Sequence, residues 1–149
     1  MTISAKPPPA AATTETIGEI KRTLGDMIVG IGLDVCSIER MRRALERHGD
    51  RFFARICSTT ERADLEQTSD RAMSLAGRFA AKEAFAKSLD GAPGVGWHEV
   101  EVRRGPNGRP QMTLIGRAHT LASQAGALRW HVSITHDAGI AAAVVILES

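Results

Sequence analysis

Apolar and polar positions follow one another along the chain in periods that predict both strands and helices. Residues 27–35 (MIVGIGLDV) form an apolar run typical of a buried strand, and the glycines in it allow another element to pack closely. Apolar side chains recurring every three or four residues predict a helix over 38–48. Capping-box spacing at 58–61 (STTE) then predicts the start of a second helix.

The remaining pattern predicts one long helix followed by a sheet. The helix runs from about Asp70 to Leu89, where Gly91 ends it. Strands are expected over 100–103, 111–115, 129–136 and 140–147, with a short helix over 116–124. The last strand is apolar on both faces and should be central. The predicted fold class is therefore α+β, a compact single domain over 27–149 in which a mostly antiparallel sheet packs against one long central helix.

Composition narrows the class of protein. Residues 1–26 contain three consecutive prolines and an Ala/Thr run, which predicts a mobile tail, with a short helical turn over 17–24. A net charge of +2 argues against a protein that coats nucleic acid. No apolar run approaches the ~20 residues of a membrane span. Two cysteines, Cys36 and Cys57, are too few for a disulfide framework, so we expect a cytoplasmic protein.

The long helix carries the most informative pattern. Counting from Ala72, helical geometry places Phe79, Glu83 and Lys87 within about 60° of it, on a largely apolar arc. A carboxylate in such an arc is costly to desolvate unless it is paired or binds a metal. The alternative is an exposed Glu–Lys pair four residues apart. Because the helix is apolar nearly all round, we also expect it to be covered on two sides, such as by another subunit.

Asp34 ends the first strand, where a side chain can project into a cleft. Its alternative role is an N-cap for the following helix. Asp34 and Glu83, together with water and substrate phosphates, would suit Mg²⁺, which takes few carboxylates from a protein.

Strand 130–136 and the arginines of the first helix are further candidates. Alternation places His136 on the face of Trp130 and puts Ser133 on the other; His136 could bind a phosphate or simply end the strand. A Ser-His-Asp triad is disfavoured because neighbours on one strand point apart. Arg40, Arg43 and Arg47 form a basic stripe, which is either a solvated face or a docking face for an acidic protein.

Three blocks resemble the holo-acyl-carrier-protein synthases, a family of small phosphopantetheinyl transferases. They are IVGIGLDV at 28–35, RFAAKEAFAK at 78–87 and HVSITHD at 131–137, and Gly108-Arg109-Pro110 matches the family's Gly-x-Pro turn. The resemblance covers residues 28–148. It departs from the family at Thr135, where serine is usual, and in the tail before Met27.

The resemblance implies a fold, a reaction and a set of residues. Asp34 and Glu83 would hold Mg²⁺ on the pyrophosphate of coenzyme A, and Lys87 would neutralise the phosphate being transferred. The coenzyme-binding residues would be Arg78, His136, Ser133 and Pro110. Arg40 would contact the acidic apo-acyl carrier protein, with Arg43 and Arg47 beside it. The family forms homotrimers with active sites between subunits, a state that would account for the doubly covered helix.

The expected reaction transfers 4′-phosphopantetheine from coenzyme A to a carrier serine and releases adenosine 3′,5′-bisphosphate. Either a water on the metal or Glu83 could accept the serine proton. The carrier could serve fatty-acid or polyketide synthesis. Two alternatives remain at this stage: a metal-dependent phosphohydrolase of a coenzyme-like pyrophosphate, and a non-catalytic oligomeric module that binds an acidic partner.

Overall fold

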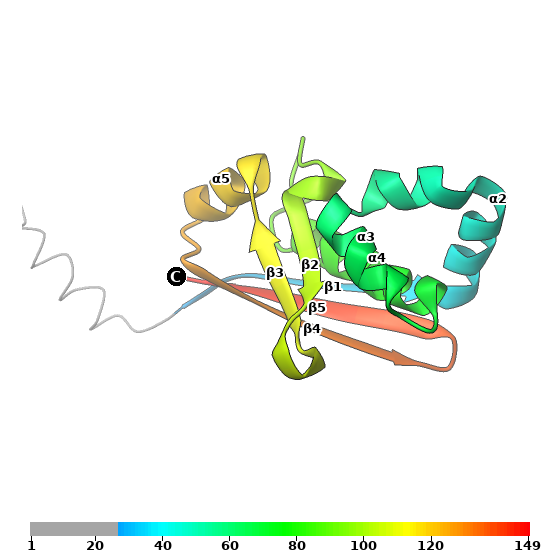
Figure 1. Ribbon diagram of the computed structural model, residues 1–149. Helices are drawn as coiled ribbons and strands as arrows, with labels where there is room; N and C mark the ends of the chain where they lie inside the picture. Colours follow the sequence, from blue (N-terminus) through cyan, green and yellow to red (C-terminus); the bar gives the residue numbers. More distant parts are fainter. Residues whose placement is uncertain (1–26) are drawn as a thin grey trace, which may run out of the picture.

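The computed structural model describes residues 27–149, so the tail predicted for 1–26 and its helical turn lie outside the described residues. The elements, labelled in Figure 1, are β1 (Ile28–Ser37), α2 (Ile38–Ile56), α3 (Thr59–Glu66), α4 (Arg71–Lys87), η1 (Trp97–Glu99), β2 (Val100–Arg104), η2 (Pro106–Gly108), β3 (Pro110–Leu114), α5 (Gly116–Gln124), β4 (Arg129–Asp137) and β5 (Ile140–Glu148). The predicted α+β class is confirmed.

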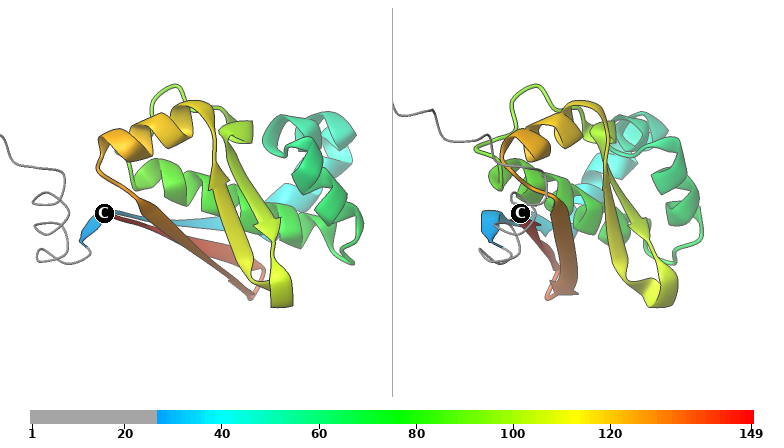
Figure 2. Two further views of the ribbon diagram at one scale, coloured as in Figure 1. Left: turned by 60° about the vertical axis from the view of Figure 1, so that its left-hand side comes forward. Right: turned by 90° about the vertical axis from the view of Figure 1, so that its left-hand side faces the viewer.

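The strands form two antiparallel sheets. A three-stranded sheet has the order β1-β5-β4, so the last strand is central as predicted. The β2–β3 hairpin is a separate two-stranded sheet, whereas the sequence suggested a single one. Figure 2 shows the hairpin standing apart from the three-stranded sheet, and the C-terminus beside the start of β1. There the Ser149 N–H donates a hydrogen bond to the Met27 carbonyl over 2.9 Å.

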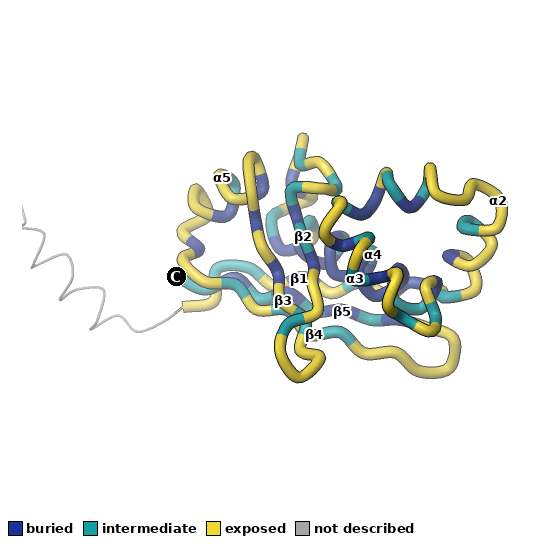
Figure 3. The backbone as a smooth tube through the Cα atoms, in the orientation of Figure 1, coloured by how far each residue is buried: buried dark blue, intermediate teal, exposed yellow. Residues whose placement is uncertain are grey.

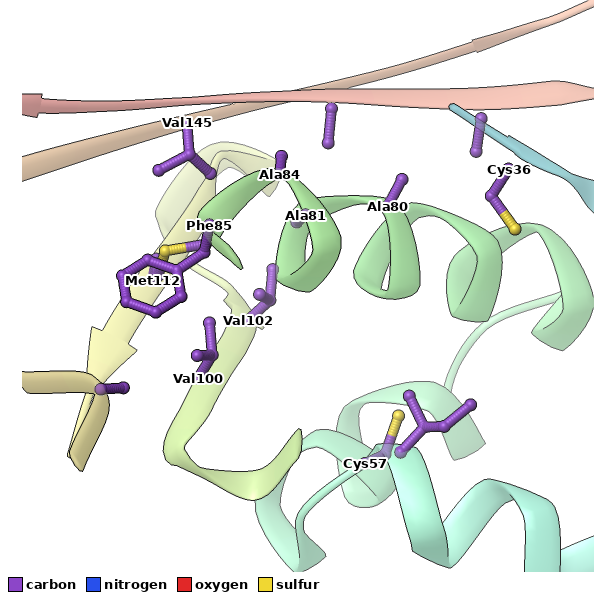
Figure 4. Packing of buried hydrophobic residues seen from close by; sticks show 14 of the residues in the cluster. Cys36, Cys57, Ala80, Ala81, Ala84, Phe85, Val100, Val102, Met112 and Val145 are labelled. Atoms are coloured by element: carbon purple, nitrogen blue, oxygen red, sulfur yellow. The ribbon is translucent and has the colours of Figure 1, made fainter. Parts of the chain in front are cut away.

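Helix α4 lies at the centre of the core. Figure 4 shows Ala80 and Ala84 directed at the three-stranded sheet, while Phe85 lies on the side of the hairpin residues Val100 and Val102. All five are at most 2% exposed. Helices α2 and α3 complete the second layer, so α4 is covered on two sides by its own chain. The expectation that another subunit supplies the second covering is therefore wrong for most of the helix.

Helix α2 is longer than predicted. It bends at Gly49, whose φ of 57° and ψ of −143° are not helical, and it continues to Ile56. The predicted end at His48 therefore marks the kink rather than the end of the helix. The second segment forms because Phe53 and Ile56 reach the core, at 2% and 3% exposure.

The outer face of the three-stranded sheet is not covered within the chain. Ile31, Leu33 and Val35 of β1 are each about 60% exposed, and the tube in Figure 3 shows exposed residues recurring along this strand. A row of exposed branched side chains on a strand is unusual for a monomer.

Within residues 27–149, the chain has no helix that is long and apolar enough to cross a bilayer.

Candidate active site on the edges of helix α4

Helix α4 presents Glu83 and Lys87 in its last two turns. Its first turn is capped by Asp70, whose carboxylate accepts a hydrogen bond from the Met73 N–H over 3.0 Å. Glu83 is only half-buried and Lys87 is exposed. The arc is apolar and buried in its first half, where Ala72 and Ala76 are 3% and 0% exposed, but it opens to solvent at Glu83 and Lys87. The alternative of an exposed Glu–Lys pair therefore describes the end of the helix better, and this end forms an accessible edge of α4.

Asp34 joins this edge from β1. Its carboxylate Oδ1 lies 2.7 Å from Lys87 Nζ, with the Asp34 side chain 14% exposed and that of Lys87 54% exposed. The hydrogen bond to Asp34, the charge of Asp34 and, less strongly, the charge of Glu83 raise the pKa of Lys87. Glu83 is thus an electrostatic neighbour of the pair. The structure brings the three predicted catalytic side chains together.

The glycines of β1 explain why Asp34 reaches the helix. A Cβ on Gly32 would lie 1.8 Å from the Ala84 carbonyl oxygen, so only glycine permits the observed approach of strand to helix. Asp34, two residues further on, points to the same side of the strand. The cap of α2 is Ser37, whose side chain accepts from the Arg40 N–H. The alternative role of Asp34 as an N-cap is therefore wrong.

A small cleft adjoins Glu83. It has a volume of about 200 Å³, and Glu83 lines it together with Phe85, Val95 and Trp97. The rings of Trp97 and Phe79 stack with their centroids 5.1 Å apart. This carboxylate therefore lies between an apolar wall and the Lys87–Asp34 pair.

A larger cleft, of about 350 Å³, gathers three of the four predicted coenzyme residues: Arg78, Pro110 and His136. Arg78 is 8% exposed, and among the described residues its Nε has no hydrogen-bond partner. Burial lowers the pKa of Arg78, although a guanidinium remains charged at neutral pH. Its Nη2 lies 3.8 Å from an Asp64 oxygen, and a guanidinium that lines a cleft is suited to binding an anion such as a phosphate.

Two further arginines, which the sequence analysis did not single out, line this cleft. Arg103 donates two hydrogen bonds to Asp64, over 2.9 and 3.2 Å, and these lower the pKa of that carboxyl. Arg104 lies beside the turn at Gly108. Their position on a strand next to the predicted Gly-Arg-Pro turn was the available signal. The cleft therefore carries more positive charge than predicted.

The structure does not bring Ser133 into this cleft. Ser133 is exposed on the outer face of the sheet, in register with Val144, which pairs in turn with Leu33 of β1. The cleft also lacks Asp34, Glu83 and Lys87. Arg78 and Glu83 are five residues apart, or about 140° around the helix at 100° per residue. Within one chain, the two halves of the predicted site thus lie on different sides of α4.

The basic stripe on α2 is exposed as predicted at Arg40, Arg43 and Arg47. Arg43 pairs with Glu39 over 2.9 Å, and the Arg40 guanidinium lies 6.0 Å from the centre of the Phe79 ring. A cleft of about 680 Å³ adjoins the stripe and is lined by Arg47 together with Ala44, His48, Arg51, Phe52 and Arg55. Basic side chains therefore continue across the kink in α2.

Within residues 27–149 no three His, Cys, Asp or Glu side chains gather into a complete metal cage.

The one deeply buried ion pair among these residues joins Lys82 to Glu61 over 2.8 Å. The sequence analysis read Glu61 only as part of a capping box and did not single out Lys82. Its position next to Glu83 on a helix with little polar surface was the signal.

Comparisons with known proteins agree with this arrangement. The family model described as the 4′-phosphopantetheinyl transferase superfamily matches residues 30–145. A holo-[acyl-carrier-protein] synthase of Solidesulfovibrio magneticus is 48% identical over 124 residues, covering 82% of the chain and 99% of that protein. The corresponding enzyme of Salinispora arenicola is 44% identical over 125 residues, covering 82% and 99%.

Solved structures are similar as well. The holo-[acyl-carrier-protein] synthase of Neisseria meningitidis superposes with a TM-score of 0.72 at 29% identity, over 83% of this chain and all of that one. A synthase of Bacillus anthracis, in complex with CoA (3′,5′-ADP), gives a TM-score of 0.67 at 34% identity, over 83% and 98% of the chains. The Helicobacter pylori enzyme, in complex with coenzyme A, gives 0.67 at 30% identity over 80% and 99%.

Proposed function

The chain belongs to the 4′-phosphopantetheinyl transferase superfamily, and from this premise we propose that Asp34, Glu83 and Lys87 are its catalytic residues. It transfers phosphopantetheine from coenzyme A to acyl carrier protein, the reaction of the synthases that it matches over most of its length. The observation that carries the assignment is the 2.7 Å contact between Lys87 and Asp34, with the Glu83 charge beside it.

The donor set fits a hard divalent cation. Asp34 and Glu83 supply carboxylate oxygens at one edge of α4, and Mg²⁺ usually takes one or two carboxylates while substrate phosphates and water fill its other positions. When bound, Mg²⁺ would neutralise negative charge on the pyrophosphate of coenzyme A.

Lys87 provides the mobile positive charge of the site. Its pKa is raised by Asp34, so the ammonium group stays protonated at neutral pH and can stabilise the phosphate being transferred. Asp34 orients this ammonium group through the 2.7 Å hydrogen bond. Glu83, half-buried beside the cleft of Trp97, is placed to bind the cation or to accept the proton of the carrier serine. The bond broken would release adenosine 3′,5′-bisphosphate.

We place the nucleotide part of coenzyme A in the cleft of Arg78, Pro110 and His136. Arg78 would donate to a phosphate, and the backbone at Pro110 would line the adenine. Because this cleft and the catalytic edge lie on different sides of α4, a complete site would form between copies of the chain. Ser133, which faces outward on β4, would then contact coenzyme A bound with a neighbouring copy.

The uncovered sheet face supports self-association. Ile31, Leu33 and Val35 are about 60% exposed, and burying them between copies would remove this apolar surface from water. The resemblance indicates three copies. Light scattering should therefore give a trimer, and Leu33→Asp should shift it toward monomer and abolish transfer. A monomeric, fully active native protein would contradict this assembly.

Complementation tests the shared site directly. Glu83→Gln and Arg78→Ala should each be inactive as pure proteins. Mixed and reassembled, they should regain part of the activity, because some interfaces then combine an intact catalytic edge with an intact coenzyme cleft. If one copy supplies both halves, no mixture regains activity.

The carrier protein would dock on the stripe of Arg40, Arg43 and Arg47. Charge on such a surface speeds the encounter with an acidic partner and sets its orientation. We assign the reaction to the cytoplasm and leave the carrier as one of fatty-acid or of polyketide synthesis. Two free, buried cysteines, Cys36 and Cys57, suit a reducing compartment. Arg47→Glu should raise the KM for carrier but not for coenzyme A.

The decisive assay for the reaction uses mass spectrometry. The full chain is incubated with Mg²⁺, coenzyme A and an apo-acyl carrier protein, and the mass of the carrier is followed. A gain equal to one phosphopantetheine group, absent when Mg²⁺ is chelated, is expected. Failure to modify fatty-acid and polyketide apo-carriers alike would contradict the assignment.

A further inference from the structure

The ion pair between Lys82 and Glu61 is buried and fully hydrogen-bonded. The side chains are 2% and 0% exposed. Lys82 Nζ donates to three acceptors, Glu61 Oε2 and the carbonyl oxygens of Ile56 and Trp97, each over 2.8 Å. An ammonium group has three donors, so Lys82 has none left for a substrate.

Both carboxylate oxygens of Glu61 also accept hydrogen bonds from the backbone. Its Oε1 accepts from the Val102 N–H and its Oε2 from the Ser58 N–H, both over 2.9 Å. Through this one pair, the end of α2, the start of α3, the middle of α4, η1 and β2 are bonded together. The position of α4 relative to the second layer is thus fixed at Lys82, the residue immediately before Glu83.

Stability alone does not account for such a pair. Replacing a buried ion pair by apolar side chains is often neutral or stabilising, because both charges must lose their hydration. The pair does fix the orientation of the Lys82 side chain, since three acceptors around one ammonium group define its position in space. Successive residues on a helix point about 100° apart. Fixing Lys82 toward the second layer therefore sets the direction of Glu83, toward the edge where Lys87 meets Asp34.

The pair also holds the wall beside Glu83. Lys82 binds the Trp97 carbonyl, and the Trp97 ring stacks on Phe79, one turn before Glu83 on α4. Trp97 and Glu83 line the same cleft of about 200 Å³. Both the helix that carries Glu83 and the surface next to it are thus anchored to the same ammonium group.

We propose that Lys82 and Glu61 are positioning residues that hold Glu83 in the direction required to bind the divalent cation. The inference rests on the proposed role of Glu83 as a metal ligand. Partners that orient a metal ligand typically contribute about 10- to 100-fold to metal affinity. The pair should therefore affect cation binding more than coenzyme binding.

The experiment measures Mn²⁺ binding to the full chain by the loss of the free-ion electron paramagnetic resonance signal, without substrate. Lys82→Met should raise the Mn²⁺ Kd about 10- to 100-fold and raise the Mg²⁺ concentration for half-maximal transfer in parallel. The KM for coenzyme A should stay near the native value. Lys82→Arg keeps the charge and several donors and should recover part of the affinity. If Lys82→Met does not fold, Glu61→Gln, similar in size but uncharged, should raise the Kd in the same direction.

Ser58→Ala is the matched control. It removes the hydroxyl that accepts from the Glu61 N–H and donates to Glu101, but it leaves both side-chain oxygens of Glu61 bonded and makes no change at Lys82. It should lower the thermal midpoint and leave the Mn²⁺ Kd unchanged. Native Mn²⁺ affinity in Lys82→Met and in Glu61→Gln, or an equal loss in Ser58→Ala, would overturn the inference.

Glu83→Gln distinguishes a failure of the positioning role from a failure of the metal site itself. If it abolishes Mn²⁺ binding while the Lys82 and Glu61 variants bind normally, the positioning role is wrong and the metal site stands. If Glu83→Gln binds Mn²⁺ like the native protein, the metal site itself is wrong, and the positioning role falls with it.

Discussion

Helix α4 carries two lysines, each paired with a carboxylate from another element, and the two pairs differ in burial and in the number of hydrogen bonds. Lys82 and Glu61 are buried, at 2% and 0% side-chain exposure, and the ammonium group has all its donors occupied. Lys87 and Asp34 are 54% and 14% exposed, and a single hydrogen bond joins them. The two lysines are five residues apart and so point to different sides of the helix.

The difference shows how the same two residue types can serve structure and chemistry on one helix. A lysine whose donors are all used by the protein can position neighbours but cannot bind a phosphate. A lysine with one partner keeps its other donors for the substrate. We therefore expect the exposed pair to govern turnover and the buried pair to govern stability and geometry.

The largest expected effect separates the pairs by activity. Lys87→Ala should lower kcat by about 10²- to 10³-fold, because it removes a charge placed at the transferred phosphate. The thermal midpoint should move by less than about 2 °C, since exposed ion pairs contribute little to stability. Coenzyme A turnover and a melting curve check both. Parallel losses of kcat and midpoint would assign Lys87 to structure instead.

The second effect separates them by stability. Lys82→Met leaves Glu61 as an unpaired buried charge and should lower the free energy of unfolding by roughly 3–5 kcal/mol. Urea unfolding followed by circular dichroism measures this. If Lys82→Met lowers the free energy of unfolding no more than Lys87→Ala does, the distinction between the two pairs is lost.

The third prediction separates Asp34 from Lys87 without substituting either residue. Gly32→Ala would place a Cβ 1.8 Å from the Ala84 carbonyl oxygen and force β1 away from α4, costing about 3 kcal/mol. Asp34 would then leave Lys87, and kcat should fall while the Lys82–Glu61 pair stays intact.

Gly77→Ala is the control for that experiment. Its Cβ would meet only the Ile134 side chain, at 3.0 Å, on the other part of the same helix–sheet interface. Because Gly77 lines the cleft of Arg78 and His136, Gly77→Ala should raise the KM for coenzyme A, but it should cost less stability and leave kcat at saturating coenzyme A near native. A larger loss of turnover in Gly77→Ala than in Gly32→Ala would refute the argument from strand position.

The smallest effect concerns a pair of intermediate burial. Asp64 and Arg103 have side-chain exposures of 17% and 47%, and Arg103 lowers the pKa of Asp64 below its ordinary value of 3.8. The pair therefore stabilises the fold above that pH, and the contribution disappears as the pH falls through the lower folded value. Asp64→Asn should cost about 1 kcal/mol at neutral pH and progressively less as the pH falls below 3.8. Thermal midpoints across that range test the sign.

The fold could be predicted where one period dominated the sequence. The strand at 28–37, the capping box at Ser58 and the central place of β5 all follow from local patterns. The continuation of α2 beyond Gly49 did not, because a positive φ at glycine normally marks a helix end. Here Phe53 and Ile56 gain enough burial to restart the helix, a tertiary effect that no local signal records.

The site could be predicted in its residue types but not in its arrangement. Asp34, Glu83 and Lys87 stood out because charges interrupt apolar runs. Periodicity on α4 left open whether Glu83 and Lys87 are buried or exposed, and it gave no sign that Lys82 is the buried lysine. Alternation along β4 already separated Ser133 from His136, but which of the two faces meets α4 and the Arg78 cleft did not follow from it. That choice is made by packing across residues distant in the chain.

The strand order β1-β5-β4 has a consequence for the order of events during synthesis. Among the strands of residues 27–149, β1 pairs only with β5, so Gly32 faces Val145 across more than a hundred intervening residues. Until β5 has emerged from the ribosome, β1 can contact α4 but has no strand partner, and closing so long a loop is entropically costly and slow. The strand that carries Asp34 is therefore held by a hydrogen-bonded neighbour only after the final strand has emerged. A nascent chain stalled before residue 140 would carry every proposed catalytic side chain, with Asp34 on an unpaired strand.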